Sequence, residues 1–373
     1  MGVGAGAPAA VTTQVELLSL ELQDFRPFRG RQAFLFARPP AGGRCGLTLF
    51  TGGGGSGKSS LSTALKLALW GSRRLDAAYF RREYGRGEAF ATDWRRFINE
   101  TALRGASPQA DLRLTLRADA GDGAPKTMVI TRSLLVSRVD SVLETLRVET
   151  AKAGEDARLE EGDFQECISA LLPPERLAHL FSDGEQLETL GGLASREPRQ
   201  RERAIREVSF LTGGRSLELW RDAVPSVIEF GNRLLACSGE DGEPRLLPEC
   251  VGRSRHGAKV VVPGVWVSSE PSSTTQRTCI GSALIVGLHL SGDVRAPLVL
   301  DAPMSRMPRD RGVVFLEALS EVARSQVVIA AHEQQIDELA LSLWDRVHRI
   351  YLVERPRDAS TALLSEPVRG GST

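Results

Sequence analysis

The 373-residue chain lacks several features that would assign it to a particular compartment or chemistry. Its five cysteines are scattered and none form a C-x-x-C pair, so neither a zinc site nor a disulfide framework is indicated. No apolar run reaches the length of about 18 residues that predicts a membrane-spanning helix. Basic and acidic residues balance at 47 each, so no net charge attracts the chain to nucleic acid or to a membrane.

The first residues also lack the basic segment that precedes the apolar core of a secretory signal. With unpaired cysteines, this favours a cytoplasmic protein with no membrane partner and a flexible tail at residues 1–14. What is present is ordinary for a globular protein: 42% apolar and 25% charged residues, enough to bury a core.

Apolar periodicity predicts an α/β fold. The expected amino-terminal strands are residues 18–25, 31–38, 46–50, 111–119, 127–136 and 142–150, with a turn at Arg29 and Gly30 between the first two. Expected helices are residues 59–70, ended by Gly71, and 164–172, ended by two prolines. Near the carboxyl end, helices 277–290, 309–324 and 335–347 alternate with strands 297–300, 326–331 and 349–353. That alternation predicts a mixed, mostly parallel sheet covered by helices, beside an antiparallel amino-terminal β lobe.

The stretch LTLFTGGGGSGKSS fits the phosphate-loop pattern G-x-x-x-x-G-K-[ST] between an apolar strand and an apolar helix. Glycines let backbone N–H groups turn toward an anion, and the helix that follows adds its positive end. Lysine supplies a point charge for the β- and γ-phosphates of ATP, and serine a hydroxyl for Mg²⁺. The candidate nucleotide-binding residues are Gly52, Gly53, Gly54, Gly55, Ser56, Gly57, Lys58, Ser59 and Ser60.

Two later strands supply further candidates. In APLVLDAP, Asp301 ends an apolar strand, as the Walker B acid that holds Mg²⁺ does; its other interpretation is a carboxylate that caps a strand end. Lys58 and Asp301 are 243 residues apart, so a large insertion separates them (301 − 58). His332 ends the next apolar strand, where it can touch a γ-phosphate or serve structure alone.

The strand–DFRPFRG–strand–phosphate-loop order resembles the amino-terminal half of the SMC/RecF/SbcC class of DNA-repair ATPases. Within that class WRRFINETA and LPPERLAHLFSDGEQLETL most resemble the DNA-sulfur-modification ATPase family DndD. The resemblance implies a P-loop NTPase head of the ABC-ATPase type, built from residues 15–190 and 258–355. It implies a shortened insertion at 191–257 in place of coiled-coil arms, and a flexible tail at 356–373.

The resemblance also implies roles for single residues. Asp183 takes the Q-loop position, where it would sense Mg²⁺ and the γ-phosphate, with Gln186 as a nearby candidate. His332 takes the H-loop position. Ser273 and Gln276 fall in the signature motif, and Arg26 sits where relatives contact the adenine or its phosphates; surface charge flanking a turn is the alternative for Arg26. The implied cofactors are ATP and Mg²⁺.

Three positions depart from the family pattern. Ala302 stands where most relatives carry a catalytic glutamate, and a methyl group cannot polarise water. Thr275 replaces the signature glycine, and Pro308 replaces an aspartate of the D-loop. The residues expected to bind the chain's own nucleotide, Lys58, Ser59 and Asp301, are thus all present. The motifs expected to act on the nucleotide of a partner head depart from the family pattern. We therefore expect ATP binding with weak hydrolysis.

The middle of the chain carries no sustained heptad pattern, so long arms are not expected. SREPRQRERAIRE, residues 195–207, predicts a short charged helix. Its arginines are either a solvated face, since glutamates are interleaved with them, or phosphate contacts. Arg73, Arg74, Arg81 and Arg82 are a second, weaker candidate for phosphate contact.

Two functional hypotheses remain open. One is an ATP-driven head that forms homodimers or heterodimers, acts on DNA in repair, modification or phage defence, and works with a partner nuclease or modification enzyme. The other is a non-hydrolysing ATP-dependent switch that docks a partner protein. A transporter ATPase fits poorly, because such motors have a shorter segment between the phosphate loop and the Walker B acid.

Overall fold

The structure is a computed structural model. It describes residues 13–39, 45–74, 94–119, 124–136, 142–152, 155–160, 163–172, 178–211, 219–236, 244–248, 259–262, 264–291, 294–336, 346–355 and 363–365.

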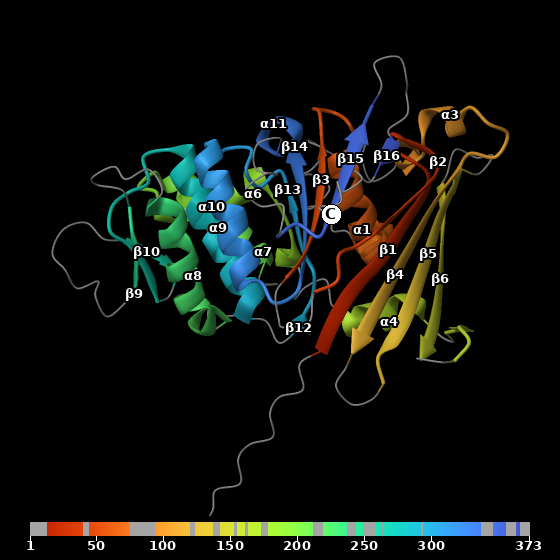
Figure 1. Cartoon of the computed structure of the whole chain (residues 1–373), viewed down its shortest axis with the longest axis horizontal. Helices are drawn as coiled ribbons and strands as arrows, with labels where there is room; N and C mark the ends of the chain where they lie inside the picture. Colours follow the sequence, from red (N-terminus) through yellow and green to blue (C-terminus); the bar gives the residue numbers. More distant parts are fainter. Residues whose placement is uncertain are drawn as a thin grey trace, which may run out of the picture.

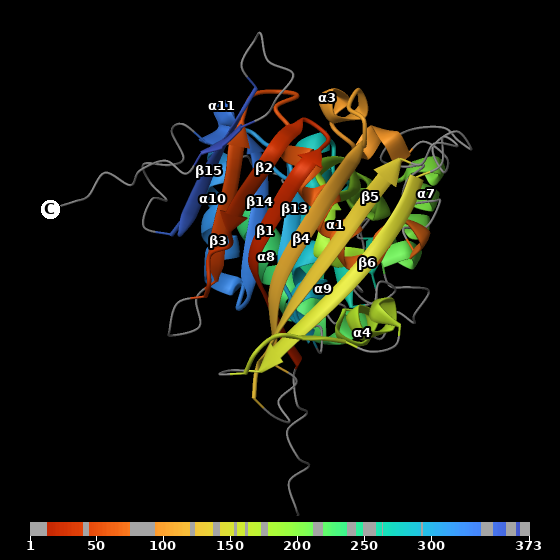
Figure 2. The same cartoon turned by 90° about the vertical axis from the view of Figure 1, so that its right-hand side faces the viewer.

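A largely antiparallel sheet, sheet A, forms one side of the molecule (Figures 1 and 2). Among the described residues its order is β12-β1-β4-β5-β6-β7, with β2 paired to β1 outside this path. Only β12 is parallel to its neighbour. The strands are β1 (Thr13–Phe25), β2 (Phe28–Leu35), β4 (Gln109–Asp119), β5 (Lys126–Val136), β6 (Val142–Lys152), β7 (Arg158–Leu159) and β12 (Val294–Arg295).

The turn between β1 and β2 differs from the sequence expectation. Phe25 pairs with Phe28, so the chain reverses at Arg26 and Pro27, three residues earlier than expected. Gly30 instead lies within β2, where its N–H donates to Asp24 Oδ1 at 2.7 Å. Arg26 therefore lies in the turn that connects β1 to β2, at the end of sheet A.

A mostly parallel sheet, sheet B, forms the centre of the molecule. Its order in the described part of the chain is β16-β15-β3-β14-β13-β8, and only β16 is antiparallel to its neighbour. The strands are β3 (Gly46–Gly52), β8 (Phe181–Asp183), β13 (Leu298–Asp301), β14 (Gln326–His332), β15 (Arg349–Glu354) and β16 (Leu363–Ser365). The predicted fold class is thus confirmed. The expectation of a loose tail from residue 356 is wrong at β16, because its backbone pairs with β15.

Helix α1 (Lys58–Arg74) lies between sheets A and B and is buried on both sides (Figure 1). Apolar side chains of sheet B alternate between this core and a second one, as a parallel sheet buried on both faces requires. Val328 of β14 faces α1, whereas Val327 and Ile329 face the other core. Gly71 (φ 66°) interrupts α1 at the predicted place, and an added Cβ there would meet the buried Arg132.

Two buried side chains join the sheets. Gln326, at the start of β14, accepts from the N–H of Leu17 at 2.6 Å and donates to the carbonyls of Leu17 and Ala37 at 2.7 and 2.8 Å. Tyr351 of β15 accepts from the N–H of Leu35 at 2.9 Å and donates to its carbonyl at 3.1 Å. These bonds satisfy backbone groups of sheet A with side chains of sheet B, so the two sheets are fixed relative to each other.

The second core lies on the far side of sheet B, around helix α9 (Thr274–Ser291), which is buried from Thr278 to His289. Helix α9 packs against α6 (Gly184–Gly191) and α8 (Leu219–Leu235), and α10 (Arg309–Val322) packs against α8 in the same core (Figure 1). At Gly281 an added Cβ would lie 1.8 Å from the Leu187 carbonyl, so this glycine permits the close crossing of α9 and α6.

The middle of the chain folds back onto this core. Its charged segment forms α7 (Pro198–Leu211), and Phe230 of α8 makes an edge-to-face contact with Phe315 of α10 at 5.9 Å. A small sheet, in the order β10-β11-β9, consists of β9 (Leu246–Pro248), β10 (Lys259–Val262) and β11 (Val265–Val267). This sheet crosses the predicted boundary at residue 257.

The other short elements are η1 (Trp94–Phe97), α3 (Glu100–Leu103), α4 (Phe164–Leu171), η2 (Ala178–Leu180), η3 (Gly192–Ala194) and α11 (Glu333–Ile336). Most of the helix expected at 335–347, residues 1–12 of the tail predicted at 1–14, and Arg81 and Arg82 lie outside the described residues. The last two residues of that predicted tail, Thr13 and Gln14, belong to β1. In the part of the chain that the structure describes, none of the helices combines the length and the apolar character needed to cross a membrane.

Candidate functional site

The phosphate loop connects β3 to α1 at the carboxyl edge of sheet B. Its backbone has positive φ at Gly52 (155°), Gly55 (72°) and Gly57 (114°), conformations that favour glycine. An added Cβ at Gly52 would lie 2.2 Å from the Val353 carbonyl, whereas one at Gly53 or Gly55 would meet nothing within 4 Å. The loop is thus packed against β15 at its start and open farther along.

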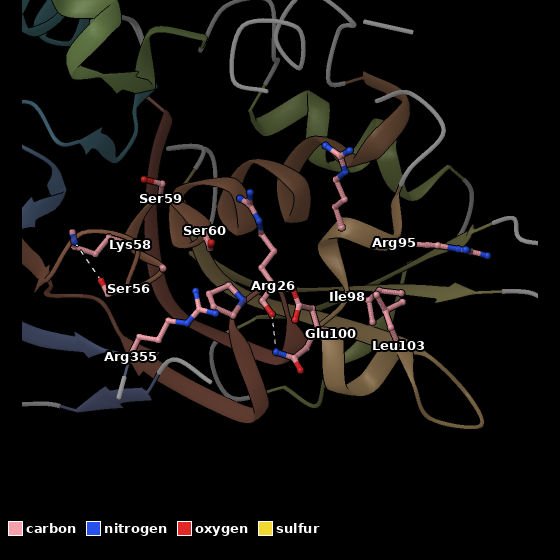
Figure 3. A pocket seen from close by; sticks show the side chains of 15 residues that line it. Arg26, Ser56, Lys58, Ser59, Ser60, Arg95, Ile98, Glu100, Leu103 and Arg355 are labelled. Atoms are coloured by element: carbon pink, nitrogen blue, oxygen red, sulfur yellow. Dashed lines mark hydrogen bonds between the residues drawn. The ribbon is translucent and has the colours of Figure 1, made fainter. Parts of the chain in front are cut away.

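Lys58 lies across this loop. Its Nζ donates to the carbonyls of Gly52 and Gly53 at 2.7 Å each and to Ser56 Oγ at 3.3 Å, the last contact drawn in Figure 3. Burial lowers the pKa of the Lys58 ammonium, and the charges of Asp301 and Glu333 partly oppose this shift. Asp301 was predicted to share the site, whereas Glu333 was missed. The feature of the sequence that could have identified Glu333 is its position directly after the strand that ends in His332.

Strand register brings the other predicted residues to the same edge. Gly52 pairs with His332 across β3 and β14, and Asp301 pairs with Ala330 and with Asp183 across β13, β14 and β8. Because these neighbours are parallel, their carboxyl ends lie side by side. His332 also approaches the loop directly, since an added Cβ at Gly54 would lie 3.9 Å from its Nε2.

Asp183 and Gln186 have local partners. Asp183 caps α6, and its Oδ1 accepts from the N–H of Gln186 at 2.7 Å. The Gln186 side chain is buried and donates to Glu207 Oε1 at 2.6 Å. Asp183 lies at the edge where the Q-loop role would place it, whereas Gln186 points to α7.

A cavity of about 730 Å³ opens on the α1 side of the loop (Figure 3). Its walls are the phosphate loop, the β1–β2 turn, the η1–α3 segment and the residue after β15. Ser59 and Ser60 line it, and so does Arg26. The sequence reading missed the remaining lining cations, Arg95, Arg96 and Arg355. The first two lie in WRRFINETA, a stretch noted only for its family resemblance.

The first turn of α9 and the loop after β13 together form what we call the signature edge. Polar side chains at this edge form hydrogen bonds within the edge itself. Ser273 Oγ accepts from the N–H of Gln276 at 3.1 Å, and Gln276 Oε1 accepts from the N–H of Ser272 at 2.7 Å. Thr275 Oγ1 donates to the carbonyl of Arg306 at 2.9 Å. Ser273 and Gln276 are not among the residues that line the cavity beside the phosphate loop.

An ion-pair cluster reinforces this edge. Glu188 of α6 contacts Arg277 at 3.2 Å and also pairs with Arg306 of the loop after β13. All three side chains line a second cavity of about 280 Å³. The signature edge is therefore held by α6 rather than presented with unpaired side chains.

Ala302, at the position of the missing glutamate, has an unusual backbone. Its φ is 49°, and its N–H donates to the Ala330 carbonyl at 2.7 Å. Its carbonyl packs against α6, because an added Cβ at Gly184 would lie 2.6 Å from that oxygen. Pro308 is the amino-terminal cap residue of α10 and provides no side-chain hydrogen bond there.

Ion pairs involve three of the five arginines in the charged segment at residues 195–207. Arg203 contacts Glu185 at 2.6 Å and Arg206 contacts Glu202 at 3.3 Å, while Arg196, just before the helix, contacts Glu270 at 3.1 Å. These contacts favour the solvated-face interpretation over phosphate contact.

Comparison with known proteins agrees with this geometry. A family model described as an AAA domain matches residues 19–173, from β1 to just beyond α4. Among curated proteins, no sequence matches the chain. Solved structures similar to it include the Smc head bound to the C-winged helix domain of ScpA, with 12% identity, TM-score 0.56, and coverage of 94% of this chain and 97% of that one.

Two further structures are similar over the same extent. The Smc head domain from Pyrococcus furiosus, with an extended coiled coil and bound to the C-terminal domain of ScpA, has 11% identity, TM-score 0.57, and coverage of 95% and 96%. The SMC head domain from Thermotoga maritima has 14% identity, TM-score 0.50, and coverage of 94% and 99%. The chain has the fold of an SMC head.

Within this SMC-head fold, the residues at the phosphate loop fit a magnesium–nucleotide complex. The open glycine positions leave space over the loop, Lys58 carries a positive charge, and Ser59 and Asp301 have side-chain oxygens of the kind that Mg²⁺ prefers. The narrower assignment to the DNA-sulfur-modification family has no support from these similarities, which establish the fold.

Proposed function

We propose that this SMC-type head binds ATP with Mg²⁺ at the loop between β3 and α1. Lys58 would bind the β- and γ-phosphates, and Ser59 and Asp301 would hold the metal. The observation that carries this proposal is the parallel strand register, which brings Asp301 of β13 to the same sheet edge as the loop after β3, although Lys58 and Asp301 are 243 residues apart in sequence (301 − 58). Bound ATP would supply the phosphoanhydride bond that is cleaved, and the residues of the chain would bind its phosphates and hold the metal.

His332 and Asp183 are proposed to sense the γ-phosphate and the metal, because they occupy the same strand edge as Asp301 and the phosphate loop. Ala302 offers no group that can accept a proton from water. Hydrolysis is therefore expected to be slow, and the bound nucleotide acts chiefly by fixing a conformation.

The hydrogen bonds at the signature edge affect how this head could pair with a second head. In an ATP-dependent pair of heads, Ser273 and Gln276 would face the partner's nucleotide, but here both take part in local hydrogen bonds. We propose that this chain pairs through its phosphate-loop side with a head whose signature edge is complete. A homodimer is the second arrangement, and it requires the contacts of Gln276 and Thr275 to open.

The biological setting proposed is DNA repair, DNA modification or phage defence in the cytoplasm, with any nuclease or modification chemistry supplied by a partner. DNA sulfur modification is the narrowest form of this proposal, and it rests on the DndD-like sequence stretches. Two solved heads of the same fold are complexes with parts of ScpA, so docking of an accessory protein is a reasonable extension to this chain. The alternative function, a non-hydrolysing switch, is favoured by Ala302.

The experiment measures Mg²⁺–ATP affinity by calorimetry and ATP turnover with and without duplex DNA. We expect binding that is lost in Lys58→Ala and slow turnover that DNA stimulates. Binding with no turnover under any condition supports the switch instead. Absence of ATP binding by the wild-type chain would overturn both, and turnover at the rate of an efficient ATPase would contradict the role given to Ala302.

A further inference from the structure

Arg26 lies on the wall of the cavity, and its backbone has a conformation that residues other than glycine rarely adopt. Its φ is 52°, and that of Asp24 at the end of β1 is 49°, so two residues other than glycine have left-handed backbones at or next to the β1–β2 turn. Such conformations persist where surrounding contacts hold them, and they cluster at functional sites. The contacts that hold Arg26 therefore bear on what it does.

The η1–α3 segment holds the turn from one side. The Arg26 N–H donates to the Phe97 carbonyl at 2.9 Å, and the Asn99 N–H donates to the Asp24 carbonyl at 2.8 Å. Asn99 Nδ2 donates to the Arg26 carbonyl at 2.8 Å. Asn99 is only 1% exposed, so this amide is a fixed and buried clamp.

The other end of Arg26 reaches the nucleotide side of the cavity. Its Nη1 donates to Thr63 Oγ1 at 3.1 Å, and Thr63 itself donates to the Ser59 carbonyl at 3.0 Å. The guanidinium lies 5.7 Å from the centroid of the Phe97 ring. One short segment thus sets both ends of Arg26, with Asn99 at its carbonyl and Phe97 beneath its guanidinium.

We propose that Asn99 is a positioning residue for nucleotide binding, which acts by fixing Arg26 beside the first turn of α1. This inference rests on the proposed function and goes beyond it, because Asn99 belongs to none of the nucleotide-binding motifs and its side chain contacts the Arg26 carbonyl and the Thr101 N–H. Fixing the cation in advance lowers the ordering cost of binding, so loss of the clamp weakens affinity without removing any charge.

The side chain of Asn99 performs two tasks that substitution can separate. Its Oδ1 caps α3 by accepting from the Thr101 N–H at 3.0 Å, while its Nδ2 holds Arg26. Asn99→Ser keeps a good capping oxygen but loses the donor to Arg26. Asn99→Asp keeps the shape and the cap and places an acceptor against the Arg26 carbonyl, so the two variants check each other if one folds poorly.

A matched control exists in α8. Asn232 Nδ2 donates to the Leu246 carbonyl at 2.9 Å, and its Oδ1 accepts from the Leu246 N–H at 2.7 Å. Asn232→Ser removes an equivalent clamp that does not line the cavity. It should reduce stability yet leave Mg²⁺–ATP affinity unchanged.

The test is a double-mutant cycle read by calorimetry with Mg²⁺–ATP as the probe. Asn99→Ser should weaken binding by about tenfold in the wild-type background and by less than about twofold in an Arg26→Ala background. A general loss of structure would instead weaken both backgrounds equally. Additive effects, or unchanged affinity in folded Asn99→Ser and Asn99→Asp, would overturn the role of Asn99. The proposed function stands in those cases if the wild type binds ATP and Lys58→Ala does not.

Discussion

The phosphate-loop edge and the signature edge of this head are built in opposite ways. At the phosphate loop, open glycine positions and the cations of Lys58 and Arg26 face a cavity of about 730 Å³. At the signature edge, hydrogen bonds occupy Gln276 and Thr275, and Glu188 pairs with two arginines. One edge is arranged to receive an anion and the other to contact its own chain.

The difference shows why separate motifs of one family pattern have to be judged separately. A left-handed backbone at Ala302 and a threonine at the signature glycine alter the second edge, while Lys58 and Asp301 at the first remain together.

The strongest test compares one substitution at each edge. Lys58→Ala should weaken Mg²⁺–ATP binding by about a thousandfold, about 4 kcal/mol, because a charged donor to phosphate is lost. Ser273→Ala should leave the affinity of the isolated chain within about twofold. Calorimetry at fixed salt measures both. Equal losses would show that the signature edge already contributes to binding within one chain.

The hydrogen bonds of Gln326, which join sheets A and B beneath the phosphate-loop edge, can be removed by substitution. Gln326→Ala leaves the buried N–H and carbonyl of Leu17 without this partner, and should lower the free energy of unfolding by about 3 kcal/mol. Urea denaturation monitored by circular dichroism measures the loss. Gln109→Ala, which removes an exposed side chain of the same type, should change stability by less than about 0.5 kcal/mol.

Helix α9 carries the signature edge at one end and the buried His289 at the other. Burial, with a smaller effect from His179, lowers the pKa of His289 from 6.5 to about 3. The unfolded chain therefore takes up this proton first as the pH falls. Between pH 6.5 and about 3, the free energy of unfolding should decrease by about 1.4 kcal/mol per pH unit through this residue.

His289→Gln should remove that dependence. Urea denaturation at pH 7.5 and at pH 5 checks it, with the difference between wild type and variant isolating His289 from other groups. A wild-type slope that the variant retains would show that His289 is protonated in the folded protein or that other residues dominate.

The smallest expected effect concerns the backbone at Ala302. Ala302→Gly should raise the free energy of unfolding by about 1 kcal/mol, because glycine adopts a φ of 49° without the penalty that a Cβ imposes. The same change at Ala330, within β14, should lower it. Thermal denaturation compares the two, and destabilisation by both would show that the Ala302 methyl contributes packing that exceeds its strain.

Much of the fold was predictable because it depends on local patterns. Alternating apolar residues located β1, β4, β5 and β6, and the glycines and Lys58 located the loop between β3 and α1. The turn was misplaced because Gly30 is a strong turn signal, yet the pairing of Phe25 with Phe28 and the bond from Gly30 to Asp24 decide it. The arginines of η1 were missed because no local pattern says that this segment packs against the β1–β2 turn and lines the same cavity as the phosphate loop.

The sequence by itself predicted the kind of site, since a glycine loop followed by lysine and serine at a helix start is the phosphate-loop pattern, and an acid after an apolar strand is the pattern of its metal ligand. Only the tertiary structure decided which other residues join it. Asn99, Arg355 and Glu333 come from separate elements, and strand register and backbone hydrogen bonds bring them to the phosphate-loop edge. Periodicity reports which face of an element is buried, whereas long-range pairing decides what that face meets.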